Sequence, residues 1–357
     1  MKTLSHVLAA LAFVASPAAA VSLYVVPDVP TDLGGITYLP SDIVRYKTPA
    51  YTLAQSLPQG VTVDALERLV SGDWIVSFEA PVDLGGTTYE PNDVVKTNGA
   101  VFTPLLCGNL VGIPAGSNVD AVMLDTAGNL VLSFDVPTTI GAFTFNPPDL
   151  VRFTRTGANC GNWIVGGLVL DGSTTVPPIP PQDNVTAADF WPTGTVVSFD
   201  VPTSLLPFDG VPGDLARWDG VSFSLFESLA GWPPGSYVDA LSFPADPGTV
   251  PVTMMAYRLL PDGSQIRITW SPGCSSGDED YEIYEGKIGS WYSHNRVDCS
   301  DDLHDLTEDV GTTSGNRYYL VVPTNGNTEG SYGTDSGGTQ RPQGAITCIA
   351  PQAIACP

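Results

Sequence analysis

The chain has 357 residues, with 14 Lys and Arg against 38 Asp and Glu and a formal net charge of −24 at pH 7. So acidic a surface repels phosphate groups, which excludes nucleic acid as an expected partner and argues against membrane insertion. With 37 Gly, 32 Pro and 43% hydrophobic residues, the composition predicts a folded protein of short strands and tight turns.

Residues 1–20 have the pattern of a secretory signal peptide. Lys2 precedes an apolar run over 7–14, and a small residue, Ala20, stands at the end of the segment. We therefore expect cleavage before Val21 and a secreted or extracellular protein, with the periplasm or the cell surface as further destinations. No later stretch approaches the roughly 20 apolar residues that span a bilayer.

Residues 21–246 contain four copies of one pattern. An acid stands two positions before a proline in each copy, at Asp28, Glu79, Asp135 and Asp200. A second acid stands three positions before a base in each copy, giving the pairs Asp42/Arg45, Asp93/Lys96, Asp149/Arg152 and Asp214/Arg217. Both markers advance by 51, 56 and 65 residues, so they keep register and predict four structural repeats.

Each repeat offers four strand candidates: a VSFD run, a DLVR run, an aromatic run such as 221–226, and a VDAL run such as 238–241. Several of them alternate apolar and polar residues, the period of half-buried strands. Turn sequences such as LGG at 33–35 and PPGS at 233–236 separate them. Four strands in a repeat of this length are typical of a propeller blade.

The ends of the array favour a ring over an open stack. The first repeat begins inside a strand at 23–28, and the array ends with a strand at 238–243 that elsewhere directly precedes a VSFD strand. Pairing of the last strand beside the first would close the circle and remove exposed edges. We predict a four-bladed β-propeller over 21–246, with a Pro-rich loop at 169–184. A β-solenoid or a sandwich-like stack is the alternative.

The SFD, D-x-V-R and VDA motifs of each repeat resemble those of a class of bacterial exported proteins built from SFD…DIVRF repeats. This resemblance implies a propeller architecture and carries over no catalytic residue.

After a Pro/Gly-rich linker at 244–252 the pattern changes to longer strand candidates. Trp270 on an early strand and the late run RYYLVVPTN (317–325) resemble the fibronectin type III pattern, in which the Trp packs in the core. The resemblance implies a small fibronectin type III-like β-sandwich over 247–342 that serves as a spacer or adhesion module. A Cys-containing tail follows over 343–357, and the whole chain is expected to be all-β.

All six Cys lie beyond residue 20, and an even count in an exported chain favours disulfides over metal or thiol chemistry. The count leaves several pairings open. Proximity in sequence favours two pairs, which leaves a third that bridges neighbouring repeats: Cys274–Cys299, Cys348–Cys356 and Cys107–Cys160. No spacing supports a zinc site.

Catalytic chemistry finds little support. Beyond the signal peptide the chain has two histidines, His294 and His304, both outside the repeats and expected at the surface or in turns. The four acids that precede the prolines would form a ring around a propeller axis, and the acids of the D-x-V-R motif would form another. Glycoside hydrolysis needs two acids in unlike environments, whereas fourfold repetition favours one structural role, such as accepting backbone N–H bonds. We assign no catalytic residue.

Candidate binding residues are the four recurrent bases, Arg45, Lys96, Arg152 and Arg217. The preferred interpretation is ion pairing with recurrent acids, and the alternative is convergence on a small anion or an acidic sugar. Four Trp residues are candidates for sugar stacking unless the core claims them: Trp163, Trp191, Trp218 and Trp232.

Two acidic runs, at 275–282 and 298–309, lack the spacing of an EF-hand. A solvated face is expected for both, with one structural Ca²⁺ as the alternative, and no other cofactor is expected.

These features favour an exported, non-enzymatic recognition or surface-structural protein that binds an extracellular glycan or protein through propeller loops. The first alternative is a carbohydrate-active enzyme, a glycoside hydrolase or lyase, that uses axial carboxylates. The second is a structural component of a bacterial extracellular assembly. The ligand and the oligomeric state stay open.

Overall fold

The computed structural model describes residues 21–205, 207–211, 213–250, 254–260, 263–300 and 306–356. The predicted signal peptide and His304 lie outside these ranges. Within them the chain folds into strands and one short helix, α1 (Gly108–Val111). The predicted all-β class is therefore confirmed.

The N-terminal part consists of four four-stranded antiparallel sheets, which we call blades. Blade 1 contains, from the inside outward, β24 (Val238–Ser242), β1 (Ser22–Pro27), β4 (Asp42–Lys47) and β5 (Ala50–Ser56). Blade 2 contains β6 (Val63–Arg68), β7 (Trp74–Phe78), β10 (Val94–Thr97) and β11 (Phe102–Leu106). Blade 3 contains β12 (Val119–Leu124), β13 (Leu130–Phe134), β16 (Leu150–Arg155) and β17 (Trp163–Leu170). Blade 4 contains β18 (Val185–Trp191), β19 (Gly194–Phe199), β22 (Asp214–Trp218) and β23 (Phe223–Ser228).

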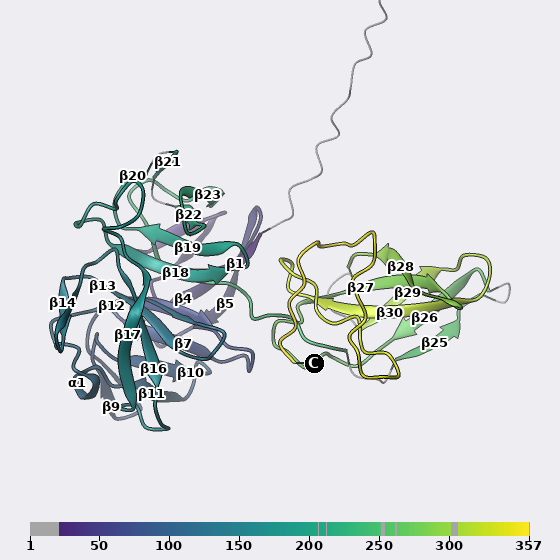
Figure 1. The fold of residues 1–357 in the computed structure, drawn as a ribbon, viewed down its shortest axis with the longest axis horizontal. Helices are drawn as coiled ribbons and strands as arrows, with labels where there is room; N and C mark the ends of the chain where they lie inside the picture. Colours follow the sequence, from purple (N-terminus) through teal and green to yellow (C-terminus); the bar gives the residue numbers. More distant parts are fainter. Residues whose placement is uncertain are drawn as a thin grey trace, which may run out of the picture.

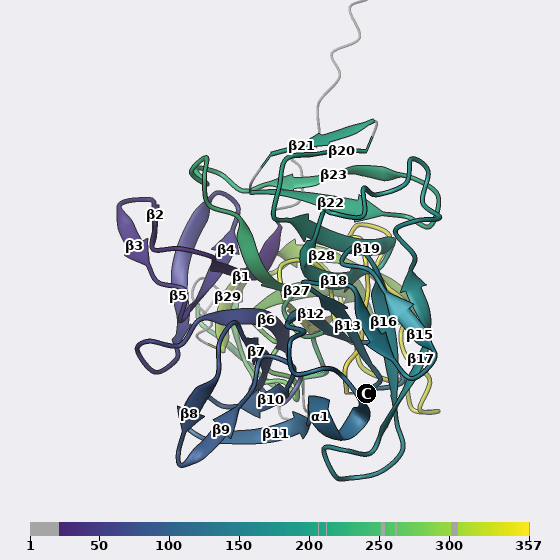
Figure 2. The same ribbon diagram turned by 90° about the vertical axis from the view of Figure 1, so that its left-hand side faces the viewer.

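The blades surround a common axis in a propeller-like arrangement (Figure 2). The inner strands β6, β12, β18 and β24 each pack against two others in a ring. The expected pairing of the last strand with the first is confirmed, because β24 pairs with β1 and Leu241 lies opposite Val25. A linear stack of repeats is thereby excluded.

Buried apolar side chains fill each of the four spaces between neighbouring blades. One cluster joins Leu23 and Val44 of blade 1 to Val196 and Leu215 of blade 4, which closes the circle. The other three clusters join blades 1 and 2, 2 and 3, and 3 and 4. The alternating apolar positions of the repeats therefore supply the contact faces between blades.

Each blade also carries a small hairpin between its second and third strands, where the sequence indicated only a turn. The hairpins are β2 (Thr31–Leu33) with β3 (Ile36–Tyr38), β8 (Val82–Leu84) with β9 (Thr87–Tyr89), β14 (Thr138–Ile140) with β15 (Phe143–Phe145), and β20 (Thr203–Leu205) with β21 (Phe208–Gly210). In the first hairpin Gly34 and Gly35 have φ angles of 68° and 85°, which only glycine adopts easily. The predicted loop at 169–184 begins two residues later than expected, after β17.

The C-terminal part consists of two three-stranded sheets. One sheet is β25 (Met255–Arg258), β26 (Gln265–Thr269) and β29 (Thr307–Gly311), and the other is β28 (Ser290–Asp298), β27 (Asp280–Lys287) and β30 (Arg317–Thr324). Trp270 is buried among apolar residues of both sheets, as predicted. The chain after β30 then returns across the second sheet, where Tyr332 packs on Tyr284.

Three disulfides are present, and only one of them has the predicted partners. Cys107–Cys160 joins loops of blades 2 and 3, as expected. The other two predicted pairs are wrong, because the returning tail brings Cys356 to Cys274 and Cys348 to Cys299. Three disulfides fit an oxidising compartment outside the cytosol.

The C-terminal part packs against one end of the N-terminal part (Figure 1). Glu279 forms an ion pair with Arg45 and accepts a hydrogen bond of 2.9 Å from Tyr24 Oη. The side chain of Asn327 bonds both the N–H and the carbonyl of Ser22, at 2.9 and 2.6 Å. Ser276 donates to the carbonyls of Leu69 and Val70 in the turn after β6, at 3.0 and 3.1 Å.

Candidate functional site

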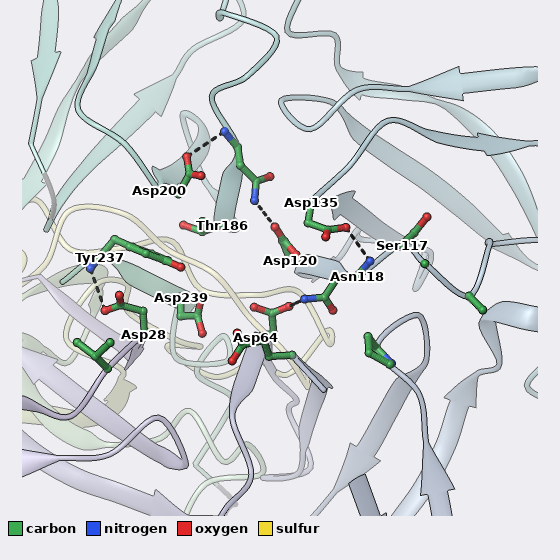
Figure 3. A pocket seen from close by; sticks show the side chains of 16 residues that line it. Asp28, Asp64, Ser117, Asn118, Asp120, Asp135, Thr186, Asp200, Tyr237 and Asp239 are labelled. Carbon is green, nitrogen blue, oxygen red and sulfur yellow. Dashed lines mark hydrogen bonds between the residues drawn. The ribbon is translucent and has the colours of Figure 1, made fainter. Parts of the chain in front are cut away.

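An acidic pocket of about 550 Å³ lies on the axis, where the inner strands begin. Each inner strand has a β-bulge at its second residue, which has no partner on the neighbouring strand. These four residues are Asp64, Asp120, Thr186 and Asp239. Since a bulge re-aims a side chain, this device turns the four toward the axis. We call them the inner ring, and all four line the pocket (Figure 3).

The outer ring consists of the acids that the sequence placed around the axis, Asp28, Glu79, Asp135 and Asp200. Each follows the second strand of its blade, and all four line the same pocket. Three of them accept a backbone N–H from the residue before a neighbouring inner strand: Asp28 from Tyr237 at 3.0 Å, Asp135 from Asn118 at 2.7 Å and Asp200 from Asn184 at 3.1 Å. The predicted structural role is confirmed for these three.

Glu79 differs from the other members of the outer ring. Its side chain is exposed and forms no hydrogen bond with a described residue, whereas its backbone N–H donates to the Thr62 carbonyl at 3.2 Å. It is therefore the outer-ring acid most available to a ligand.

The inner-ring acids are deeply buried, with 5%, 4% and 6% of the surface of Asp64, Asp120 and Asp239 exposed. The Asn118 side chain donates to Asp64, and the Asn184 side chain donates to Asp120. Asp239 lacks such an amide, because Thr62 stands at the corresponding position before β6. The carboxylate of Asp64 also contacts those of Asp120 and Asp239.

Burial shifts the acidity of this ring strongly. Desolvation raises the pKa of Asp120 to about 7. It raises the pKa values of Asp64 and Asp239 well above the ordinary range, and the neighbouring carboxylates add to both shifts. The fold therefore favours the protonated form of these buried acids, and a cation bound among them would displace protons.

Sequence reasoning missed the inner ring. The available signal was the Asp of each VDA motif, which reads as an ordinary strand residue because a bulge leaves no mark in the residue pattern.

The second predicted ring of acids does not reach the axis. Asp42, Asp93, Asp149 and Asp214 instead accept a backbone N–H three residues earlier in the chain, at 2.9, 3.0, 2.8 and 3.1 Å. Each one stabilises the turn that leads into its own strand.

Each of the four recurrent bases has a side-chain partner, and none of them lines the axial pocket. Lys96 binds Asp73 at 2.7 Å, Arg152 binds Asp125 at 2.9 Å, and Arg45 binds Glu279. Arg217 donates to Thr193 Oγ1 at 3.1 Å. The preferred interpretation of ion pairing is confirmed for three of the four, and the structure does not bring their charged groups together.

The candidate Trp residues belong to the core. Trp163 and Trp232 are buried, and their ring N–H groups donate to the carbonyls of Leu105 and Ser236 at 2.9 and 3.0 Å. Trp191 and Trp218 are half-buried against neighbouring Phe rings. Packing in the core therefore covers most of the surface of these four side chains.

Two expectations for the C-terminal part are wrong. His294 is buried rather than at the surface, because its ring nitrogens bond Tyr318 Oη and the Pro342 carbonyl. The run at 275–282 is not a solvated face, since Asp278 and Glu282 are buried and the side chain of Glu279 is only 8% exposed. The run at 298–309 lies partly outside the described residues.

Neither a metal centre nor a membrane-spanning helix is found in the described parts of the chain. No three or more His, Cys, Asp or Glu side chains there are arranged to hold one metal ion. No helix among the same residues is long and apolar enough to cross a bilayer.

No protein-family model and no curated protein matches this chain. YCF48 bound to a D1 peptide is 11% identical with a TM-score of 0.27, over 65% of this chain and 56% of the other. A protein of unknown function from Bacteroides caccae is 9% identical with a TM-score of 0.27, over 70% and 82%. The extracellular domain of the one component system BT4673 from B. thetaiotaomicron is 12% identical with a TM-score of 0.23, over 85% and 47%. This chain thus spans about half the length of the first and the third, and likeness at this level carries no argument about function.

Proposed function

We propose that this is an exported, non-enzymatic binding protein, a four-bladed propeller whose axial pocket holds a positively charged side chain of an extracellular protein partner. One observation carries the proposal. Seven carboxylates from all four blades line one pocket, and no Lys, Arg or His is among the described residues that line it. The ionised acids of such a pocket attract a cation, and the charge of a bound cation favours loss of the protons that the buried acids hold.

An ammonium or guanidinium group fits this pocket better than a bare metal ion. About 550 Å³ is the size of a small-ligand site, and no acid cluster of the described residues is arranged around one metal position. Asp120 Oδ1 is buried without a hydrogen-bond partner, which makes it an available acceptor. A Lys or Arg side chain would supply several N–H donors to such oxygens.

Asp239 and Glu79 are the residues most suited to receive the cation. Asp239 is the inner-ring acid without an amide donor, and Glu79 is the exposed acid of the outer ring within its electrostatic reach. A cation between them would compensate two acids that receive no hydrogen bond from an amide side chain.

The placement of the C-terminal part supports this function. It contacts the turn after β6, at the opposite end of the inner strands from the pocket, so the mouth stays open. Two three-stranded sheets around Trp270 agree with a fibronectin type III-like spacer. We propose that this part holds the propeller at the cell surface or links it to an extracellular assembly.

Titration calorimetry with a short lysine-rich peptide tests the proposal. We expect binding by the native protein, loss of binding when the lysines are acetylated, and at least about tenfold weaker binding by Asp239→Asn and Glu79→Gln. Asp32→Asn is the matched control, because it removes the same charge from an exposed turn outside the pocket. Protons should be released on binding, so the measured heat should depend on the ionisation enthalpy of the buffer.

The proposal would be contradicted if the native protein did not bind the lysine-rich peptide. Equally weak binding by Asp32→Asn would also contradict it, because the loss of affinity would then follow from the overall charge of the protein and not from the pocket. A carbohydrate-active enzyme remains the second candidate because Asp120, with a pKa raised by burial to about 7, shares a pocket with other acids. If the native protein released sugar from a glycan and Asp120→Asn did not, the pocket would be a catalytic site and not a binding site.

A further inference from the structure

A second cavity, of about 520 Å³, lies on the C-terminal part. Trp291 and Tyr292 at the start of β28 and Tyr318 on β30 form its aromatic wall, and a loop that carries Asp335 and Arg341 forms another. Trp291 is 64% exposed and Tyr292 is 47% exposed. Large aromatic side chains are usually buried, so a group of them around an open cavity indicates a binding function.

The backbone of the sheet makes room for this wall. Gly286 lies on the middle strand β27, opposite Tyr318. A Cβ atom at position 286 would lie 2.1 Å from Cζ of the Tyr318 ring, so only glycine lets that ring cross the strand. Glycine inside a strand otherwise weakens it, and a close approach of this kind accounts for its presence.

A buried histidine fixes the orientation of Tyr318. His294 Nε2 lies 2.9 Å from the Pro342 carbonyl, and Nδ1 lies 3.1 Å from Tyr318 Oη. A carbonyl only accepts, so Nε2 carries the proton and Nδ1 of the neutral ring accepts from the tyrosine hydroxyl. Burial lowers the pKa of His294, which favours the neutral ring.

Tyr292 is held in an unusual conformation. Its φ angle of 67° lies in the left-handed region, which bulky side chains rarely adopt. Its hydroxyl donates to Asp335 at 3.2 Å, and Asp335 also accepts the backbone N–H groups of Gly337 and Thr339 at 2.8 and 3.0 Å. Aromatic wall and polar loop are therefore fixed to each other before any ligand arrives.

The shape of the aromatic pair suits a sugar ring. The Trp291 and Tyr318 rings contact each other, with centroids 5.5 Å apart and planes inclined by 39°, and together they form one aromatic surface. The electron-rich faces of such rings attract the C–H groups on the apolar face of a pyranose. Asp335 and Arg341 at the edge offer an acceptor and donors for its hydroxyls, and Arg341 forms no ion pair with a described acid.

We propose that this aromatic cleft is a second binding site, for an uncharged sugar ring of an extracellular glycan. The net charge of −24 disfavours acidic glycans, and the cleft balances one acid with one base. The site is separate from the axial pocket and does not depend on the function proposed for it.

The test is an array of neutral and acidic glycans probed with the full chain, followed by titration of the best neutral oligosaccharide. We expect neutral glycans to be retained and Trp291→Ala to bind at least about tenfold more weakly. Tyr257→Ala is the matched control, since Tyr257 is an aromatic side chain of β25, 49% exposed and outside the cleft. Gly286→Ala should weaken binding as well, because its methyl group displaces Tyr318.

Retention of no glycan would overturn the proposal, as would equal binding by Trp291→Ala and the native protein. Retention of a proline-rich peptide in place of glycans would replace it with peptide recognition. Asp239→Asn should bind the oligosaccharide as the native protein does. Loss of glycan binding in that variant would move the sugar to the axial pocket and contradict the site described here.

Discussion

Glu279 pairs with the recurrent base of blade 1, whereas in blades 2 and 3 an acid of the same blade pairs with this base. In blades 2 and 3 the base on the third strand pairs with an acid in the turn between the first and second strands, Asp73 or Asp125. Blade 1 has no such turn, because its first and second strands come from opposite ends of the repeat array. The acid for Arg45 comes instead from the C-terminal part.

This difference predicts unequal effects of removing equivalent bases. Arg45→Met should lower the free energy of unfolding by about 1.5–3 kcal/mol, because it leaves Glu279 buried without its charged partner. Arg152→Met should cost less than about 1 kcal/mol, since the Arg152 side chain is partly exposed to water and Asp125 keeps its hydrogen bonds from the N–H groups of Ala127 and Asn129. The side chains of Arg45 and Glu279 are 26% and 8% exposed, and those of Arg152 and Asp125 are 41% and 13% exposed. Urea denaturation of both variants measures the difference, and equal losses would contradict this account.

The inner strands show how one irregularity creates a site. Each has its bulge at the same place, so four equivalent residues turn toward the axis. Blade 4 carries Thr186 there, whose hydroxyl donates to the Val238 carbonyl at 2.7 Å, and the other three blades carry Asp. A neutral residue of similar size is thus already accommodated at this position.

Asp239→Thr should therefore stabilise the protein at neutral pH, by about 1–3 kcal/mol, because it removes a buried acid that lacks an amide partner. The pKa of Asp239 is raised in the folded state, so its unfavourable effect is absent below the unfolded pKa and grows as pH rises. The gain should accordingly disappear near pH 4. Thermal unfolding at both pH values tests this, and destabilisation at neutral pH would show that Asp239 is needed for the fold itself.

Buried acids are a property of the whole molecule rather than of the pocket alone. Elsewhere on the inner strands, Glu67 of β6 contacts Asp189 of β18, and burial raises both pKa values, that of Asp189 to about 7. In the C-terminal part, burial beside Glu329 raises the pKa of Glu282 to about 10. Each of these groups holds a proton in the folded state that it would lose on unfolding at neutral pH.

The protein should consequently be more stable in mild acid than in base. Raised acid pKa values mean that the folded state binds more protons, so stability is lost as pH rises from about 4 toward about 10. Each retained proton contributes a slope of about −1.4 kcal/mol per pH unit in that window. Calorimetric midpoints at a series of pH values measure the trend. Higher midpoints at pH 8 than at pH 5 would contradict it, and Glu282→Gln should flatten the alkaline end of the curve.

The sequence predicts the repeats, the closing strand pair and the outer ring because these depend on residues with fixed spacing. Asp28 and its equivalents follow strands in every copy, so fourfold geometry places them together. The inner ring depends on bulges, which a period-two pattern does not reveal. The pairing of Cys274 with Cys356 and the burial of His294 depend on the path of the tail, which has no repeat to guide prediction.

The aromatic cleft escaped prediction for a related reason. Trp291 and Tyr318 lie on different strands, and their approach depends on Gly286 between them. The residues next to Gly286 in the sequence do not indicate that the Tyr318 ring lies across it. The Trp residues of the repeats looked equally suitable, but the spaces between blades bury or half-bury them.

The double hydrogen bond between Asn327 and Ser22 has a mechanical consequence. Because β1 and β24 are antiparallel, the first residue of β1 and the last residue of β24 lie at the same end of their seam. Separation of β1 from β24 at this end would also break the two hydrogen bonds between Asn327 and Ser22. When the chain is pulled at its ends, the C-terminal part should therefore detach from Ser22 before the ring opens.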